Sequence, residues 1–314
     1  MDLFWSNPHC DVPRSIALGT FDGVHLGHQK LLQAALDHRP QHGCSSVFTF
    51  DIPPQQFFRQ DYRMLCSFDH KAKLIREFGI DEVIWTRFSY EVAQISAEDF
   101  VEELLVKRLH AVHIVCGFNF RFGHKGQGSV EMLAALGPKQ GFTVTVVPEV
   151  TSDELPISST RIRALVAEGN VEEAALLLGR YPSYQGTVVK GMGRGKRLGF
   201  PTANLEVDPR IVLPGDGVYV TWAILRDGRG YLSVTSVGKN PTFAGDKQTV
   251  ETYILDYSGD LYNQDIELQF LQKTRKIERF HSAAALKQQI SADVDTARQL
   301  IGRFRLHGNR IVLQ

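Results

Sequence analysis

Hydrophobic patterning divides the chain into two halves of different fold class. In the first half, short apolar runs alternate with amphipathic segments. The strand-like runs are Ser15–Leu18, Ser46–Phe50, Glu82–Trp85, His113–Cys116 and Thr143–Pro148, and the helix-like segments are Gly27–His38, His70–Phe78, Ala97–Leu109 and Ser129–Leu136. Such alternation is typical of a parallel sheet with helices on both faces. We therefore predict an α/β domain whose ligand site lies beyond the carboxyl ends of the strands, in the glycine-rich loops.

The pattern changes after residue 154. PISSTRIRALVAEGNVEEAALLLGR reads as a turn and two short helices, and YPSY (Tyr181–Tyr184) contains a helix-breaking proline and reads as a linker. From Gln185 on, turns separate the β-rich runs GTVVKG, GVYVTWAIL, GYLSVTSVG, TVETYILDY and DIELQFLQ, which predicts an antiparallel sheet or small barrel. Ser282–Phe304 has the apolar spacing of a long final helix. The predicted domains are residues 1–180 and 181–314.

Composition narrows the class of protein. Lys plus Arg and Asp plus Glu number 35 each, so bulk charge indicates neither nucleic acid nor a membrane as a partner. No run is apolar for long enough to span a bilayer, and the N-terminus does not resemble a signal peptide. The cysteines Cys10, Cys44, Cys66 and Cys116 form no CxxC pair, which favours free thiols in a cytoplasmic protein. The oligomeric state is open, and a homo-oligomer is compatible with the sequence.

The stretch LGTFDGVHLGHQKLL, Leu18–Leu32, carries the candidate chemistry of the first half. His25 and His28 are three residues apart at the start of a predicted helix, so they share one face. Gly27 between them is expected to let a ligand approach the backbone, and a helix N-terminus suits phosphate. A zinc site and a pair of structural histidines are the alternatives.

Two further segments favour the phosphate interpretation. CGFNFRFGHKGQGS, Cys116–Ser129, interleaves aromatic residues with Asn119, which suits a planar ligand. ISSTRIR, Ile157–Arg163, places three hydroxyls before a helix, where they can cap it and also bind phosphate oxygens.

A glycine-rich basic loop marks the second half, in GTVVKGMGRGKRLGFPTANLEV (Gly186–Val207). It is not a Walker loop, because Arg197 stands where a serine or threonine is required. In the PTAN that follows, Thr202 and Asn204 lie two residues apart in an extended segment and therefore share one face. That face suits Mg²⁺ with phosphate, since Mg²⁺ prefers oxygen ligands. The alternative is a basic surface hairpin.

The order of these motifs resembles that of bifunctional bacterial riboflavin kinase/FAD synthetases. GTFDGVHLGHQ and ISSTRIR resemble the two nucleotide-binding motifs of the nucleotidyltransferase superfamily, and CGFNFRFG resembles the flavin-binding segment of FAD synthetases. The Gly186–Val207 stretch is similar to riboflavin kinases, as are GVYV, SVGKNPTF, VETYILDY, GDLY and FLQKTRKIERF. The resemblance implies a Rossmann-like nucleotidyltransferase domain followed by a small flavokinase-type antiparallel barrel that ends in a long helix.

The resemblance also implies two ATP-dependent reactions that link riboflavin, FMN and FAD. In the first domain, FMN would attack the α-phosphorus of ATP and pyrophosphate would leave, with His25 and His28 stabilising the transition state. The implied nucleotide contacts there are Gly19, Thr20, Phe21, Asp22, His25, His28, Ser159, Thr160 and Arg163.

In the second domain, Glu251 would accept the proton of the riboflavin 5′-hydroxyl as it attacks the γ-phosphate of ATP. The implied nucleotide contacts of the kinase are Gly191, Gly193, Gly195, Lys196, Gly199, Thr202 and Asn204. Thr202 and Asn204 would also hold Mg²⁺, which both reactions are expected to need, with ATP as co-substrate. Asn119 and Arg275 are the implied flavin contacts.

Two positions depart from the family pattern. Thr20 replaces the usual asparagine of the first motif, and FDIPPQQFF (Phe50–Phe58) lacks the histidine of the usual His-Pro pair. These departures motivate a first alternative, a riboflavin kinase whose N-terminal domain is weakly active or senses nucleotide. A second alternative is a flavin- or nucleotide-binding protein without catalysis. Another nucleotidyltransferase, such as a cytidylyl- or pantetheine-phosphate enzyme, would explain only the first half.

Overall fold

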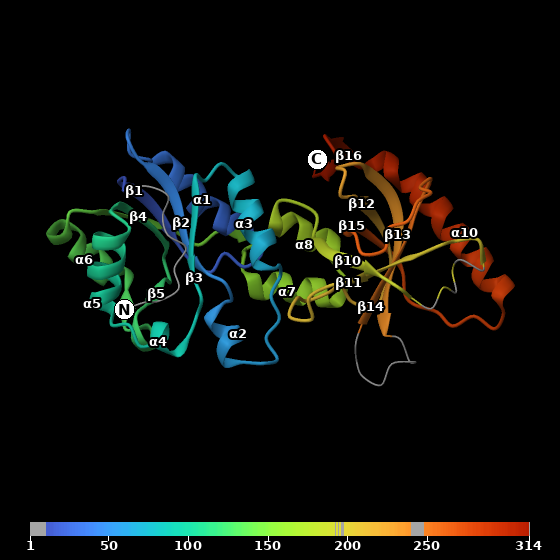
Figure 1. The fold of residues 1–314 in the computed structure, drawn as a ribbon, viewed down its shortest axis with the longest axis horizontal. Coiled ribbons are helices and arrows are strands. Elements are labelled where there is room, and N and C mark those ends of the chain that lie inside the picture. Colours follow the sequence, from blue (N-terminus) through green and yellow to red (C-terminus); the bar gives the residue numbers. More distant parts are fainter. Residues whose placement is uncertain (1–10, 192, 194, 196–197, 240–247, 314) are drawn as a thin grey trace. The chain divides into compact units, whose positions relative to one another are not determined.

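The computed structural model describes residues 11–191, 193, 195, 198–239 and 248–313. The chain divides into two compact units, residues 1–159 (unit 1) and 160–314 (unit 2). Unit 1 is built on an open sheet and unit 2 on a closed barrel (Figure 1). Of the residues singled out above, Cys10, Lys196 and Arg197 lie outside the described residues.

Five parallel strands form the sheet of unit 1. They are β1 (Arg14–Leu18), β2 (Cys44–Phe50), β3 (Glu82–Thr86), β4 (Ala111–Gly117) and β7 (Thr143–Val147), in the spatial order β3-β2-β1-β4-β7. Each overlaps a strand predicted from the sequence. The chain moves outward from β1 to β3 and then crosses to β4, so the strand order reverses between β1 and β4. Sheets of this kind bind ligands beyond the carboxyl ends of the strands next to such a reversal.

Helices cover both faces of this sheet, because both faces are apolar. On one face, α1 (Leu26–Asp37) and α3 (Phe68–Glu77) bury Leu32 and Ile75 with Val47 of the sheet. The other face is covered by α5 (Ala97–Asp99), its π-helical continuation η1 (Phe100–Arg108) and α6 (Val130–Gln140). These helices confirm the predicted ones.

Several short elements of unit 1 are absent from the sequence prediction. They are α2 (Pro54–Phe58), α4 (Tyr90–Ala93), η2 (His124–Gly126), the hairpin of β5 (Arg121–Phe122) with β6 (Gly128–Ser129), and the hairpin of β8 (Thr151–Ser152) with β9 (Leu155–Pro156). All of them lie in loops between the main strands and helices.

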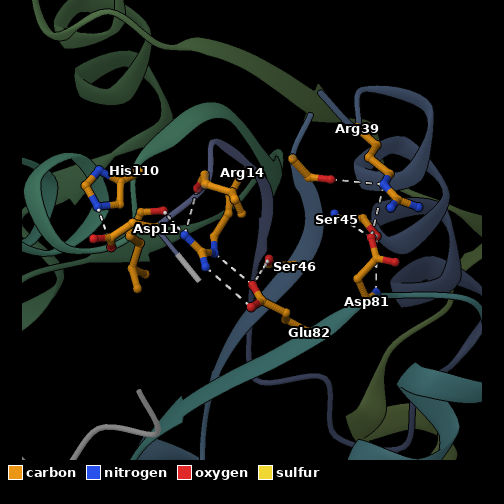
Figure 2. Close-up of polar contacts among 11 residues, drawn as sticks. Asp11, Arg14, Arg39, Ser45, Ser46, Asp81, Glu82 and His110 are labelled. Atoms are coloured by element: carbon orange, nitrogen blue, oxygen red, sulfur yellow. Dashed lines mark hydrogen bonds and ion pairs between the residues drawn. The ribbon is translucent and has the colours of Figure 1, made fainter. Parts of the chain in front are cut away.

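A buried ion pair joins the amino ends of β1 and β3 (Figure 2). Arg14 is fully buried, and its Nε donates to Glu82 Oε2 over 2.7 Å. Ser46 of β2 donates its hydroxyl to the same carboxylate oxygen over 3.0 Å. Arg14 Nη1 also donates to the carbonyls of Val12 and Leu109, over 2.8 and 3.3 Å. Charged and polar contacts therefore hold three strands together at the end of the sheet opposite the expected ligand site.

Six antiparallel strands close the barrel of unit 2, which confirms the predicted small barrel. In spatial order they are β10 (Ser183–Val189), β11 (Ala203–Glu206), β14 (Gln248–Ile254), β13 (Gly230–Lys239), β12 (Gly217–Ile224) and β15 (Asp265–Arg275), and β15 pairs again with β10. Tyr184, in the segment that reads as a linker, is instead a buried barrel residue whose ring lies 5.3 Å from that of Phe270.

The helices of unit 2 also agree with the sequence. The two short helices are α7 (Ser159–Glu168), which begins at the boundary of the units, and α8 (Val171–Leu178). The long helix α10 (Ala283–Leu300) buries Ala297 against Val218 and Val234 of the barrel. After it come η3 (Ile301–Arg303) and an unpredicted hairpin of β16 (Arg305–His307) with β17 (Arg310–Val312). Within the described residues, no helix combines the length and apolar character needed to cross a membrane.

Four fully buried hydroxyls are hydrogen-bonded to one another inside the barrel, and we call them the hydroxyl chain. Thr221 Oγ1 lies 2.7 Å from both Ser233 Oγ and Thr235 Oγ1, and Thr235 Oγ1 donates to Thr252 Oγ1 over 2.9 Å. The hydroxyl chain links β12, β13 and β14 through their side chains, in addition to the backbone hydrogen bonds of the barrel.

Candidate active sites

The loop after β1, residues 19–25, leads into α1 and positions the two predicted histidines. His25 is the N-cap residue of α1, and its Nδ1 accepts the backbone N–H of His28 over 3.3 Å. The two imidazoles stack with centroids 3.7 Å apart and an interplanar angle of 18°. The ring of Phe21 lies 5.2 Å from that of His28. Two imidazoles thus meet at a helix N-terminus, whose N–H groups suit phosphate.

Gly27 has a different role from the predicted one. A Cβ at this position would lie 3.1 Å from Cε1 and 3.2 Å from Nδ1 of His25. The ring of His25 therefore fills the space beside the backbone that a ligand was expected to occupy. In the same loop, Phe21 and Val24 have φ of 51° and 42°, in the left-handed region that such residues rarely adopt. Strain of this kind concentrates at functional sites.

Asp22 ties this loop to two distant segments of unit 1. Its Oδ1 accepts the backbone N–H of Leu65 over 2.8 Å, and its carbonyl accepts the hydroxyl of Ser159 over 2.8 Å. Ser159 therefore contacts the loop that carries the histidines. In α7, Arg163 Nη2 donates to Thr160 Oγ1 over 3.0 Å. The nucleotide-binding roles of Thr160 and Arg163 stay predictions.

An aromatic cluster lies at the carboxyl ends of β2 and β3, and the sequence prediction does not include it. Its members are Phe50, Phe57, Phe58, Phe88 and Tyr90, with neighbouring ring centroids 5.0 to 6.5 Å apart in edge-to-face contacts. Phe58 is 59% and Tyr90 67% exposed. The segment FDIPPQQFF, noted above for the histidine it lacks, thus supplies three of the five rings. Asn119 is also exposed, in the loop after β4.

The second site lies on the outward-facing side of β11 and β14. Asn204 and Glu251 are direct partners in the register of these antiparallel strands, so their side chains leave the same face of the sheet. Both are partly exposed, whereas the neighbours Val250 and Thr252 of Glu251 are buried inside the barrel. Phe200 packs edge-to-face on Tyr253 with ring centroids 5.3 Å apart, beside this pair.

Two of the described glycines of the basic loop, Gly191 and Gly195, lie against the PTAN side chains. A Cβ on Gly191 would lie 2.1 Å from Asn204 Nδ2, and a Cβ on Gly195 would lie 3.3 Å from Thr202 Oγ1. Gly193 and Gly199 have φ of 66° and 91°, which favours glycine. Two loop glycines, a hydroxyl, an amide and a carboxylate are thereby brought together. Lys196 lies outside the described residues.

Arg275 is already engaged in a bidentate ion pair. Its Nε and Nη2 donate to the two carboxylate oxygens of Asp293 in α10 over 2.8 and 2.7 Å, and Nη1 donates to the Lys276 carbonyl over 3.0 Å. The Asp293 carboxylate raises the pKa of the Arg275 guanidinium. A guanidinium carries five N–H groups, so two are left for a phosphate.

Comparison with known proteins assigns the two halves separately. The family model described as FAD synthetase matches residues 7–161, and the one described as riboflavin kinase matches residues 178–301. The bifunctional riboflavin kinase/FMN adenylyltransferase of Listeria monocytogenes is 35% identical over 299 residues, which are 94% of each chain. The protein of the same name from Pseudomonas fluorescens is 36% identical over 90% of this chain and 91% of its own. This chain belongs to that bifunctional family.

A solved structure shares the fold over nearly the whole length. It is a protein from Streptococcus pneumoniae named macrolide-efflux protein, 32% identical, with a TM-score of 0.81 over 92% of this chain and 96% of that one.

Membership confirms the sequence-based function. The chain is an enzyme that phosphorylates riboflavin to FMN and adenylylates FMN to FAD, with ATP as co-substrate. Neither a binding protein without catalysis nor a different nucleotidyltransferase accounts for both family matches. Among the described residues, no group of three His, Cys, Asp or Glu side chains is placed to hold a metal, so the zinc alternative for His25 and His28 finds no further ligands there.

Proposed function

We propose that adenylyl transfer takes place over residues 19–28 of unit 1. The strongest support is the stacked pair of His25 and His28 at the N-terminus of α1. There the phosphate of FMN would attack the α-phosphorus of ATP and displace pyrophosphate. No covalent intermediate with the protein is needed, so the imidazoles and helix N–H groups act by positioning the phosphates and neutralising charge. Gly19, Thr20, Phe21, Asp22 and Ser159 would shape this site, and Thr160 and Arg163 would add contacts to the nucleotide.

The kinase step is proposed to use the outward face of β11 and β14. Its strongest support is the direct pairing of Asn204 with Glu251. The Glu251 carboxylate would take the proton of the riboflavin 5′-hydroxyl, whose oxygen forms the new bond to the γ-phosphorus while ADP leaves. A hydroxyl is a poor nucleophile until its proton is being removed, so a carboxylate is required at this place.

Thr202 and Asn204 fit an Mg²⁺ ion that arrives with ATP. Both offer oxygen donors, which Mg²⁺ prefers. When bound, Mg²⁺ would neutralise phosphate charge. The loop glycines 191, 193, 195 and 199 and Lys196 would close over the nucleotide.

The aromatic cluster is the best candidate to hold the flavin ring during adenylyl transfer. Exposed rings that support one another edge-to-face form an apolar platform for a planar ligand, and Asn119 would add a polar contact. Arg275 is proposed to use its two remaining N–H groups on the flavin phosphate in the kinase.

Other features of this protein stay predictions. We expect the activities to divide near residue 180, as 1–180 and 181–314. A cytoplasmic location is proposed because the described cysteines Cys44, Cys66 and Cys116 are free thiols. Neither nucleic acid nor a membrane is expected as a partner, and a homo-oligomer is compatible with the sequence.

Product analysis tests the proposal. The purified protein is incubated with riboflavin, ATP and Mg²⁺, and riboflavin, FMN and FAD are separated by chromatography. Both FMN and FAD are expected. FMN without FAD would support the first alternative, a kinase with a weakly active N-terminal domain.

Single substitutions separate the two sites. Glu251→Gln is expected to abolish FMN formation and to leave conversion of added FMN to FAD intact, and His28→Ala is expected to do the reverse. Asp227→Asn, in an exposed turn of the barrel, and His42→Ala, in an exposed loop, are the matched controls. Equal loss of both activities in either test variant would contradict the division of roles.

A further inference from the structure

Lys71 is a buried cation directly beneath the loop that carries the histidines. It lies in α3 and is 4% exposed. Its Nζ donates to the carbonyls of Phe50 and Thr20 over 2.8 and 3.0 Å and to Thr49 Oγ1 over 3.1 Å. Thr49 Oγ1 in turn donates to the Thr20 carbonyl over 3.1 Å. The three N–H groups of the ammonium are thus matched by three oxygens at the carboxyl ends of β1 and β2.

None of these three oxygens carries a formal charge. Among the residues that the structure describes, no carboxylate forms an ion pair with Lys71. The charges that favour its ammonium form from a greater distance are those of Cys66, Asp22 and Asp51. Both carboxylates accept backbone N–H groups, Asp22 from Leu65 and Asp51 from Ile52 and Phe88.

Burial therefore dominates the titration of Lys71 and lowers its pKa to about 8. A buried ammonium costs free energy unless an anion compensates it. Lys71 Nζ donates to the Thr20 carbonyl. An anionic ligand bound over residues 19–28 would therefore lie close enough to compensate the charge of Lys71.

We propose that Lys71 is a positioning residue for adenylyl transfer, and that the triphosphate of ATP compensates its buried charge. The ammonium fixes the Thr20 carbonyl and hence the loop that leads to His25 and His28. It also makes the potential above this loop more positive without contacting the nucleotide. The inference rests on the proposed placement of ATP over residues 19–28.

The dependence of ATP binding on pH tests the role of this charge. If the triphosphate compensates Lys71, bound ATP favours the ammonium form, and loss of the proton weakens ATP binding. For the conversion of FMN to FAD, the KM for ATP should be constant from pH 7 to 7.5 and rise above pH 8, by at most about tenfold per pH unit. Phosphate groups finish ionising well below pH 8, so ATP itself contributes little to this rise.

Substitution of Lys71 separates charge from hydrogen bonding. In Lys71→Met, the KM for ATP at pH 7.5 should rise about tenfold or more and no longer depend on pH up to 9. Lys71→Gln restores two N–H donors without the charge, so it should keep the high and pH-independent KM. A role limited to fixing the Thr20 carbonyl would instead let the glutamine rescue the KM.

Three controls make the outcome decisive. Riboflavin phosphorylation is measured with the same preparations. Its KM for ATP and the pH dependence of that KM should be the same in the Lys71 variants as in the unsubstituted protein. Cys66→Ser removes a thiol whose charge would interact with Lys71, and it should keep the rise above pH 8. His28→Ala tests the ATP placement separately, because unchanged FAD synthesis there would remove the premise whatever Lys71 does.

A constant KM for ATP from pH 7 to 9 in the unsubstituted protein would overturn the proposal. So would a rise that disappears in Cys66→Ser or persists in Lys71→Met. If Lys71→Met does not fold, the proposal is still tested by the KM for ATP of the unsubstituted protein and of Cys66→Ser between pH 7 and 9, because both proteins retain Lys71.

Discussion

Removing the Arg14 side chain should destabilise unit 1 more than almost any other single change in it. In Arg14→Met, the Glu82 carboxylate, 7% exposed, would keep the hydrogen bond from the Ser46 hydroxyl but would lose the guanidinium that compensates its charge. The carbonyls of Val12 and Leu109 would also lose a donor. Breaking a buried ion pair from one side costs about 3–5 kcal/mol, and the two carbonyls place this case toward the upper end.

Urea unfolding measures this loss. With an m value of about 2 kcal/mol per molar urea, the midpoint of unit 1 should fall by about 2 M. Trp85 is a local reporter, since it lies in β3 and its ring packs 4.9 Å from that of Phe68. Its fluorescence is measured in a variant in which Trp5 and Trp222 are replaced by phenylalanine, so that Trp85 is the only tryptophan. FAD synthesis per folded molecule should not change without urea, because the ion pair lies at the opposite end of the sheet from residues 19–28.

A double variant shows whether the charge is the cause. Arg14→Met with Glu82→Leu removes both buried charges, so it should cost less than Arg14→Met alone, with the carbonyls of Val12 and Leu109 accounting for most of the remainder. A midpoint shift below about 0.5 M for Arg14→Met, or a double variant as costly as the two single variants together, would refute the reasoning.

Three further predictions address other parts of the chain. His113 stacks on His38 with centroids 3.9 Å apart, and burial lowers its pKa to about 4. Between pH 7 and 5 the unfolded chain binds a proton at His113 and the folded chain does not, so the free energy of unfolding of unit 1 should fall by at most about 2 kcal/mol. In urea titrations, His113→Gln should reduce that fall. Gly191→Ala would place a Cβ 2.1 Å from Asn204 Nδ2 and displace that side chain. FMN formation should therefore fall more than about tenfold, as expected when one positioning contact is lost, while conversion of FMN to FAD continues. Gly302→Ala, where a Cβ meets nothing within 4 Å, is its control and should leave both activities intact. Gly27→Ala should tilt the His25 ring and slow only FAD synthesis, and unchanged product ratios in chromatography would show that the stacking is dispensable.

The sequence predicts the long elements because their periodicity repeats often enough to be read. The five strands of unit 1, the helices α1, α3 and α6, five of the six barrel strands and α10 all follow from it, whereas the short strand β11 does not. Shorter elements cannot be predicted in this way, because α4 has four residues and β5 and β6 have two residues each. Their conformation depends on tertiary contacts that no local pattern records.

Site residues divide in a similar way. Glycines, histidines and hydroxyls in loops after strands are visible in the sequence, and Glu251 is identified only by resemblance to riboflavin kinases. Lys71 is not visible, because a lysine in an amphipathic helix normally reads as a surface residue and only the tertiary fold buries it. The aromatic cluster draws on two segments about thirty residues apart, Phe57–Phe58 and Phe88–Tyr90, so its assembly is a property of the sheet order.

The hydroxyl chain inside the barrel has a consequence for strand alignment. If β14 slid by two residues along β13, each side chain would keep its face, and apolar packing alone would tolerate the slip. Thr235, however, would then face Val250 or Ile254 in place of Thr252, and a buried hydroxyl would lose its partner. Each such loss costs about 1–3 kcal/mol. The hydroxyl chain therefore disfavours a slip of β14 along β13, and so holds the strand that carries Glu251 in its observed register.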